Sequence, residues 1–196
     1  MKNKHKIYVL TVLSLISAVL IIQTFVPWLG YLPLGFANVT IAHVTVIIGA
    51  VLLGVQGGAI LGGIWGVLAL IRNLVQPNIL SPIFYNPIVA ILPRLLVGVI
   101  VGFLYQQLAK RMGPLKAGAI SGAIGALTNT VLVTIAVVLF AKTTYAQIMH
   151  IPESAVLIAF VAAVAFNAIF EVLVAAVLTP IITRPLIALR DRQSKS

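Results

Sequence analysis

The chain has 196 residues, of which 61% are hydrophobic and only 8% are charged. Soluble globular domains are about half apolar and about a quarter charged, so this composition excludes an ordinary water-soluble domain and indicates a protein of the lipid bilayer. Since a spanning helix needs about 20 apolar residues, the chain has room for about five to seven spans and for no separate soluble catalytic domain.

The net charge of +10 is high for such a short chain. In a soluble protein it would indicate nucleic acid as a partner, but here the basic residues lie at the edges of apolar runs. Membrane topology explains them better, so we expect no nucleic-acid partner. The chain has no cysteine, which excludes a disulfide framework, a thiolate metal site and a thiol nucleophile.

The first apolar run, at about residues 7–26, follows a basic N-terminus and is not ended by a small-x-small cleavage site. It is therefore predicted to be a retained first span rather than a signal peptide. Pro27 opens a loop rich in Gly, Pro and aromatic residues that runs to Phe36. The second span, residues 41–53, would be only about 20 Å long against a hydrocarbon core of about 30 Å. Short spans often border binding sites.

Four more spans are predicted downstream. A tight turn at Gly54, Gly57 and Gly58 leads into a glycine-rich third helix, and glycine favours close helix packing in membranes. Residues 74–87 and 142–154 are expected to be loops. The sequence thus predicts an all-α integral membrane protein with a single six-helix domain over residues 1–196, whose third to sixth spans lie at about residues 58–72, 88–108, 115–141 and 155–180.

Basic residues assign the sides of the membrane. The N-terminus, the loop between the fourth and fifth spans and the C-terminal end hold most of the thirteen Lys and Arg residues, namely Lys2, Lys4, Lys6, Lys110, Arg111, Lys116, Arg184, Arg190, Arg192 and Lys195. The positive-inside rule places these segments, and both termini, in the cytoplasm. We therefore expect a multi-pass protein of the cell membrane, whose three longer loops face outward and form a candidate lid.

Few polar side chains fall inside the predicted spans. A charge at the centre of a spanning helix costs about 2.5–3.5 kcal/mol on insertion scales, so such residues normally face protein, a cavity or a ligand. Arg94 lies roughly 10 Å from the outer end of its span, and Asn129 and Asn167 each lie roughly 18 Å from theirs. Glu171 follows Asn167 by one helical turn, so the two residues share a face.

These residues leave two kinds of interpretation open. Arg94 either binds an anionic ligand group bidentately or forms an internal ion pair with Glu171. Asn129 and Asn167 either hydrogen-bond a ligand or bridge helices. Glu171 is either a structural partner or an acceptor for a ligand hydroxyl, rather than a proton carrier, because proton relays use chains of Asp, Glu and His.

Three further polar residues lie near the outer ends of the second and third spans. His43, in the short second span, is either a ligand contact or a packed imidazole. Arg72 and Asn73 close the outer end of the third span. Together with Arg94, Arg72 makes this region of the molecule net basic.

Enzyme signatures are absent or weak. The His150-x-x-Glu153 pair has no third ligand, so we expect no metal site. Gly118-Ala-Ile-Ser-Gly resembles a serine hydrolase elbow but lies in a predicted helix without an accompanying His. No Gly-x-x-x-x-Gly-Lys-Ser/Thr loop is present, so the chain is not expected to hydrolyse ATP itself, and we expect neither a cofactor nor enzyme activity.

Several motifs carry a family resemblance. They are Ile41-Ala-His-Val-Thr-Val-Ile-Ile-Gly-Ala-Val-Leu-Leu-Gly, then Gly57-Gly-Ala-Ile-Leu-Gly-Gly-Ile-Trp-Gly and Ile71-Arg-Asn, and later Phe84-Tyr-Asn-Pro and Ile91-Leu-Pro-Arg-Leu-Leu-Val-Gly. They resemble the substrate-binding S components of energy-coupling factor (ECF) vitamin transporters, and within that family the pantothenate-specific members. The resemblance is good from about residue 34 to residue 105, while the length and the six-span layout agree over the whole chain.

This resemblance implies a six-helix S component that captures a vitamin from outside under its outer loops. Its implied partners are a transmembrane coupling protein and two cytosolic ATPases, and toppling of the S component in the membrane would deliver the vitamin inward. In such proteins a small-x-x-x-small motif on the first helix docks on the coupling protein. The matching positions here are Ser14 and Ala18, where serine replaces the usual alanine but still allows close approach.

The resemblance also implies a pantothenate site. An arginine on the fourth helix and an asparagine on the fifth are expected to hold the carboxylate and the amide-diol portion of the vitamin, and Arg94 and Asn129 match those places. A net basic, amide-lined pocket suits such a monoanion. The other residues expected to contribute are Asn73, Tyr85, Asn86, Asn167, Arg72, His43 and Glu171.

Three alternatives stay open. Another vitamin, such as niacin, a thiamine-related compound or folate, fits the same family, and aromatic residues that could stack on a larger ligand cluster in the loops at Trp28, Tyr31, Phe36, Phe84 and Tyr85. An intramembrane enzyme is disfavoured because the sequence shows no Cys, no Ser/His site at depth and no paired carboxylates. A stand-alone secondary carrier often shows inverted repeats, and none is evident here.

Overall fold

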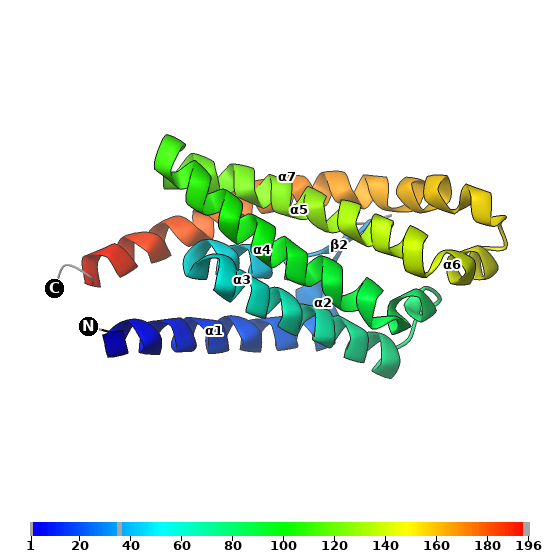
Figure 1. Cartoon of the computed structure of the whole chain (residues 1–196), viewed down its shortest axis with the longest axis horizontal. Coiled ribbons are helices and arrows are strands. Elements are labelled where there is room, and N and C mark those ends of the chain that lie inside the picture. The colour runs from blue at the N-terminus through cyan, green and yellow to red at the C-terminus, as the bar shows by residue number, and fades with distance from the viewer. Residues whose placement is uncertain (1, 35–36, 194–196) are drawn as a thin grey trace.

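The computed structural model describes residues 2–34 and 37–193, and helices dominate it (Figure 1). The long helices are α1 (Lys2–Phe25), α3 (Ala42–Val75), α4 (Pro87–Met112), α5 (Pro114–Phe140) and α7 (Val156–Gln193). The shorter elements are α2 (Pro27–Gly30), strands β1 (Tyr31–Leu34) and β2 (Ala37–Thr40), α6 (Lys142–Met149) and the 3₁₀-helices η1 (Ser81–Tyr85) and η2 (Glu153–Ala155). Five of the described helices are long and apolar enough to cross a membrane, which confirms the predicted helical membrane protein.

Two helices that meet at Gly54 make up α3. A Cβ atom on Gly58 would lie only 2.8 Å from Cβ of Ala50, although residues eight positions apart are separated by about 12 Å along one continuous helix. The chain therefore reverses at Gly54, whose φ of 73° is a conformation that glycine adopts without strain. The predicted turn at Gly54 is confirmed, whereas Gly57 and Gly58 lie inside the second half of α3 rather than in the turn.

The two halves of α3 differ in length. The first half, residues 42–53, is about 18 Å long, well short of the hydrocarbon core of about 30 Å. The second half, residues 55–75, reaches about 31 Å and matches that thickness. The prediction of an unusually short second helix is therefore confirmed.

Glycines set the distance between the second half of α3 and α4. A Cβ atom on Gly58 would collide with the backbone of Gly98, and one on Gly62 would collide with the backbone of Arg94. By contrast, a Cβ atom on Gly63 would meet nothing within 4 Å. Lipid tails are as apolar as leucine, so membrane helices gain most from such close backbone approach. This interface fixes the position of Arg94.

A similar contact joins α5 to α7. A Cβ atom on Gly122 would collide with the carbonyl oxygen of Ala175, and one on Gly118 would lie 3.3 Å from Pro180. α7 continues through Pro180 and Pro185 to Gln193, beyond the predicted end near residue 180. A membrane helix can continue through proline because neighbouring helices and side chains satisfy the backbone groups that proline frees.

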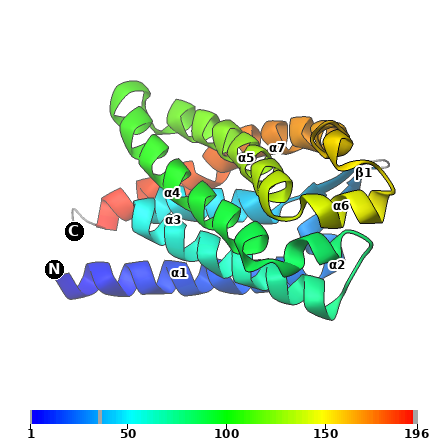
Figure 2. The ribbon, with the colours of Figure 1, turned by 45° about the vertical axis from the view of Figure 1, so that its right-hand side comes forward.

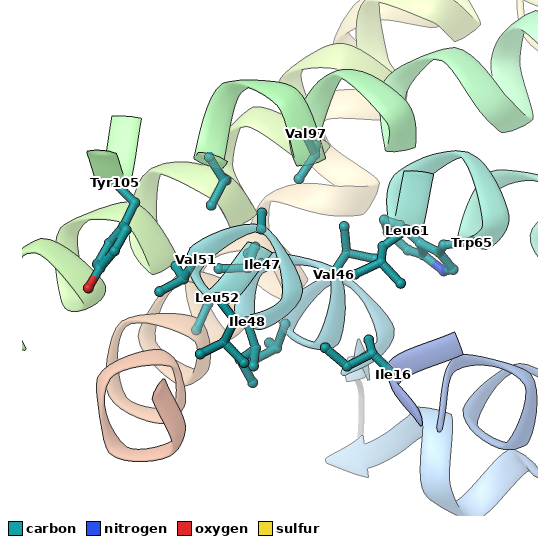
Figure 3. Close-up of a cluster of buried hydrophobic side chains, with 14 of the residues drawn as sticks. Ile16, Val46, Ile47, Ile48, Val51, Leu52, Leu61, Trp65, Val97 and Tyr105 are labelled. Atoms are coloured by element: carbon teal, nitrogen blue, oxygen red, sulfur yellow. The ribbon is translucent and has the colours of Figure 1, made fainter. Parts of the chain in front are cut away.

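The hydrophobic core surrounds the first half of α3 (Figure 3). Val46 and Ile47 are fully buried there, and Ile16 of α1 and Val97 of α4 pack around them. A second cluster lies under the loops between α5 and α7 and around η1, where the rings of Tyr145 and Phe160 meet edge to face at 5.4 Å. The short α3 half is thus enclosed by its neighbours on most sides.

Two segments predicted to be loops hold regular structure. After Pro27 the chain forms α2 and an antiparallel hairpin in which Tyr31 of β1 pairs with Thr40 of β2, so two short strands are added to the predicted all-α fold. Phe36 and the side chains of Trp28 and Tyr31 lie outside the described part of the molecule. The segment 142–154 contains α6 and η2, which an ion pair of 3.8 Å between Lys142 and Glu153 connects.

The basic segments share one end of the molecule. The start of α1, the end of α7 and the connection from α4 to α5 lie together, whereas η1 and α6 lie at the opposite end (Figures 1 and 2). This arrangement agrees with the sidedness expected from the positive-inside rule.

Candidate functional site

Arg94 lies about two turns inside α4, roughly 10 Å from the start of that helix. Asn86 caps the helix, because its Oδ1 accepts a hydrogen bond of 2.9 Å from the backbone N–H of Ile88. Gly62 brings α3 against the backbone of Arg94, and only 9% of the Arg94 residue is exposed. The guanidinium is therefore a charge held deep among helices.

Two aromatic rings hold the Arg94 guanidinium. Its Cζ lies 5.5 Å from the ring centroid of Trp65 on α3 and 5.2 Å from that of Phe84 on η1. Cation–π attraction of this kind is strongest where water is excluded. One terminal nitrogen, Nη1, donates a hydrogen bond of 2.8 Å to the backbone carbonyl of Val89. These contacts keep the guanidinium in one orientation.

Arg94 keeps hydrogen-bonding capacity to spare. A guanidinium has five N–H donors, and the buried Nε of Arg94 has no hydrogen-bond partner within the described part of the chain. Among the described residues no acidic side chain forms an ion pair with it. A buried charge without a counter-ion is costly, so this geometry can receive an anionic group such as a carboxylate in bidentate fashion.

Glu171 on α7 has a different partner. Its Oε1 accepts a hydrogen bond of 3.0 Å from the backbone N–H of Thr40, where β2 leads into α3. Helix α3 begins there without a side-chain cap, its N-cap residue being Ile41, and a carboxylate near a helix N-terminus is favoured by the helix dipole. Glu171 and Arg94, both among the described residues, form no ion pair with each other, so the structure does not support that interpretation.

The Asn73 side chain ties α3 to η1. Its Oδ1 accepts a hydrogen bond of 2.7 Å from Oγ of buried Ser81, and its Nδ2 donates one of 2.7 Å to the carbonyl of Ala69. Ser81 Oγ in turn accepts from the backbone N–H of Asn78 at 2.8 Å. Since η1 carries Phe84, this network positions one of the rings that hold Arg94.

The remaining candidate residues lie at different depths. Tyr85, at the end of η1, is 43% exposed. Asn129 and Asn167 are partly buried on α5 and α7, and Oδ1 of Asn129 is a buried acceptor that no described residue bonds. His43 is fully buried, with both ring nitrogens unpartnered among the described residues. Arg72 is partly buried near the end of α3.

Sequence reasoning missed Trp65 and Ser81 as parts of this site. Trp65 falls within a quoted motif, but nothing in the sequence indicated that its ring faces Arg94 of another helix. Ser81 lies among the prolines of a segment that was predicted to be a loop, so its role in the site was not predicted.

The two residues matched to the docking motif lie away from this site. Ser14 and Ala18 are both exposed on α1. Residues four positions apart share one face of a helix, so they form a small-residue strip open to the surroundings.

Comparison with known proteins agrees with the motifs in the sequence. The family described as "ECF transporter, substrate-specific component" matches residues 9–183. The chain belongs to this family. As a member, it is a membrane transport component that crosses the bilayer several times, which confirms the resemblance stated above.

Two relatives of this S component are named as pantothenate transporters. It is 36% identical to the pantothenate transporter PanT of Leuconostoc mesenteroides over 97% of this chain and 96% of that protein. It is 30% identical to the pantothenic acid transporter PanT of Lactococcus lactis subsp. cremoris, over 78% of this chain and 79% of that protein.

Proposed function

We propose that this S component binds pantothenate and delivers it into the cell together with an ATPase-driven ECF module. One observation carries the choice of ligand: Arg94 is buried between Trp65 and Phe84 with N–H donors to spare and no acidic partner among the described residues. A small carboxylate satisfies this guanidinium, and pantothenate is such a monoanion. The names of the two relatives support the same vitamin.

Each polar residue has a role in this proposal. Arg94 binds the carboxylate, and Asn129, whose buried Oδ1 lacks a partner, hydrogen-bonds the amide-diol portion. Tyr85, Asn167, Arg72 and His43 complete the surroundings of the ligand. Asn73 and Asn86 support the site without contacting the ligand, because their amide oxygens already accept hydrogen bonds from Ser81 and Ile88.

The proposal includes a topology. Counting the two halves of α3 separately, the chain crosses the membrane six times, and the end with the basic segments faces the cytoplasm. The hairpin, η1 and α6 then cover the vitamin from outside. Because the chain has no cysteine, single cysteines at Ser154 and Gln107 can be probed without background. An impermeant maleimide should label Ser154→Cys but not Gln107→Cys in intact cells, and the reverse pattern would overturn the orientation.

The partners follow from the family. A transmembrane coupling protein and two cytosolic ATPases supply the energy, since this chain has no nucleotide-binding loop. The strip of Ser14 and Ala18, exposed on α1, provides the close approach for the coupling protein.

Isothermal titration of the detergent-purified chain against a panel of vitamins tests the proposal. We expect tight one-to-one binding of pantothenate and no binding of niacin, thiamine or folate. Arg94→Ala should weaken pantothenate binding at least about 100-fold, because a charge-assisted bidentate contact is lost. Arg111→Ala, at an exposed arginine on the same helix, is the matched control and should bind normally. Binding of another vitamin, or full affinity in Arg94→Ala, would refute the assignment.

A further inference from the structure

A groove lies away from Arg94, between α1, α3 and α7, and its volume is about 500 Å³. Residues such as Val12 and Leu15 of α1 form one wall, Ile182 and Leu186 of α7 form the other, and Ile48 of α3 lies between them. This volume falls within the range of about 300–1,000 Å³ that is typical of small-molecule sites. The groove is therefore large enough for a specific ligand.

The lining of the groove is almost entirely hydrocarbon. Its polar members are Tyr8 near one end and the pair Gln23 and Thr45 near the other. Thr45 Oγ1 donates a hydrogen bond of 2.8 Å to Gln23 Oε1, so these two side chains bond to each other. An apolar chain fits this interior better than a polar metabolite does.

The groove has the length of a lipid chain. Along α1 its lining extends from Tyr8 to Gln23, which is about 22 Å of helix. One leaflet contributes about 15 Å of hydrocarbon, half of the bilayer core. An acyl chain entering from the Tyr8 end would thus be in contact with the groove over its whole depth in that leaflet.

The Tyr8 end of the groove is basic. Lys4 and Lys6 belong to the segment that begins α1, and Arg184 and Arg190 belong to the last part of α7. The start of α1 and the end of α7 lie at the same end of the molecule (Figure 1). Basic residues outnumber acidic ones in these segments, because Lys2, Lys4, Lys6, Arg184, Arg190, Arg192 and Lys195 accompany Asp191 alone.

We propose that this groove is a binding site for an anionic phospholipid. One acyl chain lies between α1 and α7 on the surface of α3, and the phosphate lies at the basic end, where α1 begins and α7 ends. Clusters of basic residues at the ends of membrane helices attract anionic lipids of the cytoplasmic leaflet. The bound chain completes the packing of α1, whose spanning segment is only 17% buried. This inference does not depend on the identity of the vitamin.

Native mass spectrometry of the full-length chain, titrated with phosphatidylglycerol and phosphatidylcholine of identical acyl chains, tests the site. We expect one phosphatidylglycerol to bind at least tenfold more tightly than phosphatidylcholine. Val19→Trp, which fills the groove, should weaken phosphatidylglycerol binding at least tenfold. Ile169→Trp is the matched control, because Ile169 is an exposed apolar residue of α7 outside the groove, and it should bind as the wild type does.

A second pair of variants tests the headgroup. Lys4→Gln combined with Arg190→Gln should abolish the preference for phosphatidylglycerol, while Lys110→Gln combined with Arg111→Gln, two basic residues that end α4, should keep it. Thermal unfolding in detergent shows whether each variant is folded. Wild-type lipid affinity in Val19→Trp, or equal affinity for both lipids in the wild type, would overturn the proposal. So would a Val19→Trp variant that retains lipid but no longer co-purifies with a coupling protein.

Discussion

Helices α1 and α4 have similar lengths, 24 and 26 residues, but opposite relations to the rest of the molecule. Buried residues make up 44% of the apolar spanning segment of α4, but only 17% of that of α1. Glycines bring the α4 backbone against α3 and hold Arg94 among aromatic rings. α1 presents large apolar side chains such as Leu10 and Leu15 outward.

This difference supports the proposal that α4 serves ligand binding and α1 serves assembly with partners. Lipid can replace an apolar side chain at a helix surface, but it cannot replace close contact between two backbones. Changes at the interface of α3 and α4 should therefore damage the fold and the proposed vitamin site together. Changes on the outer face of α1 should leave both intact and affect only what docks there.

The largest effect is expected at Gly62. In Gly62→Leu the new side chain collides with the Arg94 backbone, and we expect a loss of stability of about 3 kcal/mol together with loss of pantothenate binding. Thermal unfolding in detergent, followed by intrinsic fluorescence, measures the change. Gly63→Leu is the matched control, since a Cβ atom there meets nothing within 4 Å. Equal behaviour of the two variants would mean that the helices are not in close contact.

A smaller effect is expected at Glu171. Glu171→Leu removes the acceptor for the Thr40 N–H, and a hydrogen bond to a charged group contributes about 1.5–3 kcal/mol. Amide hydrogen exchange around Thr40 should become at least tenfold faster. Glu171→Gln keeps a carbonyl acceptor, so its exchange rate around Thr40 should lie between those of Glu171→Leu and the wild type. Unchanged exchange in Glu171→Leu would show that the carboxylate does not hold the hairpin.

The aromatic enclosure of Arg94 predicts a more modest effect. Phe84→Leu removes one ring face from the guanidinium, and a desolvated cation–π contact contributes about 1–2 kcal/mol. Pantothenate binding should weaken by about 5- to 30-fold in isothermal titration. Phe103→Leu, at an exposed phenylalanine of α4, serves as the control and should bind normally. An equal loss in both variants would remove Phe84 from the site.

The smallest effect on vitamin binding is expected on α1. Ala18→Trp places a bulky group on the exposed strip with Ser14, so pantothenate affinity should stay within about twofold, because surface changes usually cost less than about 0.5 kcal/mol. Co-purification with the coupling protein should be lost. Leu127→Trp, on an exposed position of α5, should keep both properties. Loss of vitamin binding in Ala18→Trp would show that α1 and α4 do not have separate roles.

The sequence was sufficient for the features that depend on one segment at a time. Apolar runs located the long helices, and the glycines predicted the turn at Gly54 and the short helix before it. The length of α7 was not predicted, because the helix continues through Pro180 and Pro185, which membrane helices tolerate. The hairpin of β1 and β2 was missed because four-residue strands leave almost no periodic signal.

The sequence was not sufficient for contacts between distant segments. Depth along each helix was predicted from helical rise, but the rotation of one helix against another was not. Glu171 therefore remained a candidate partner for Arg94, although its hydrogen-bond donor is Thr40, 131 positions away in the sequence. For the same reason Trp65 was not recognised as a neighbour of the Arg94 guanidinium.

The turn at Gly54 has a consequence for biosynthesis. Residues 42–53 are fewer than the roughly 17 apolar residues that a segment needs to enter the bilayer as a span of its own. This segment packs against the second half of α3, where Ala50 meets Gly58. We therefore expect residues 42–75 to enter the membrane together as one helical hairpin, and a substitution that weakens the pairing at Gly58 should cause misinsertion before it causes unfolding.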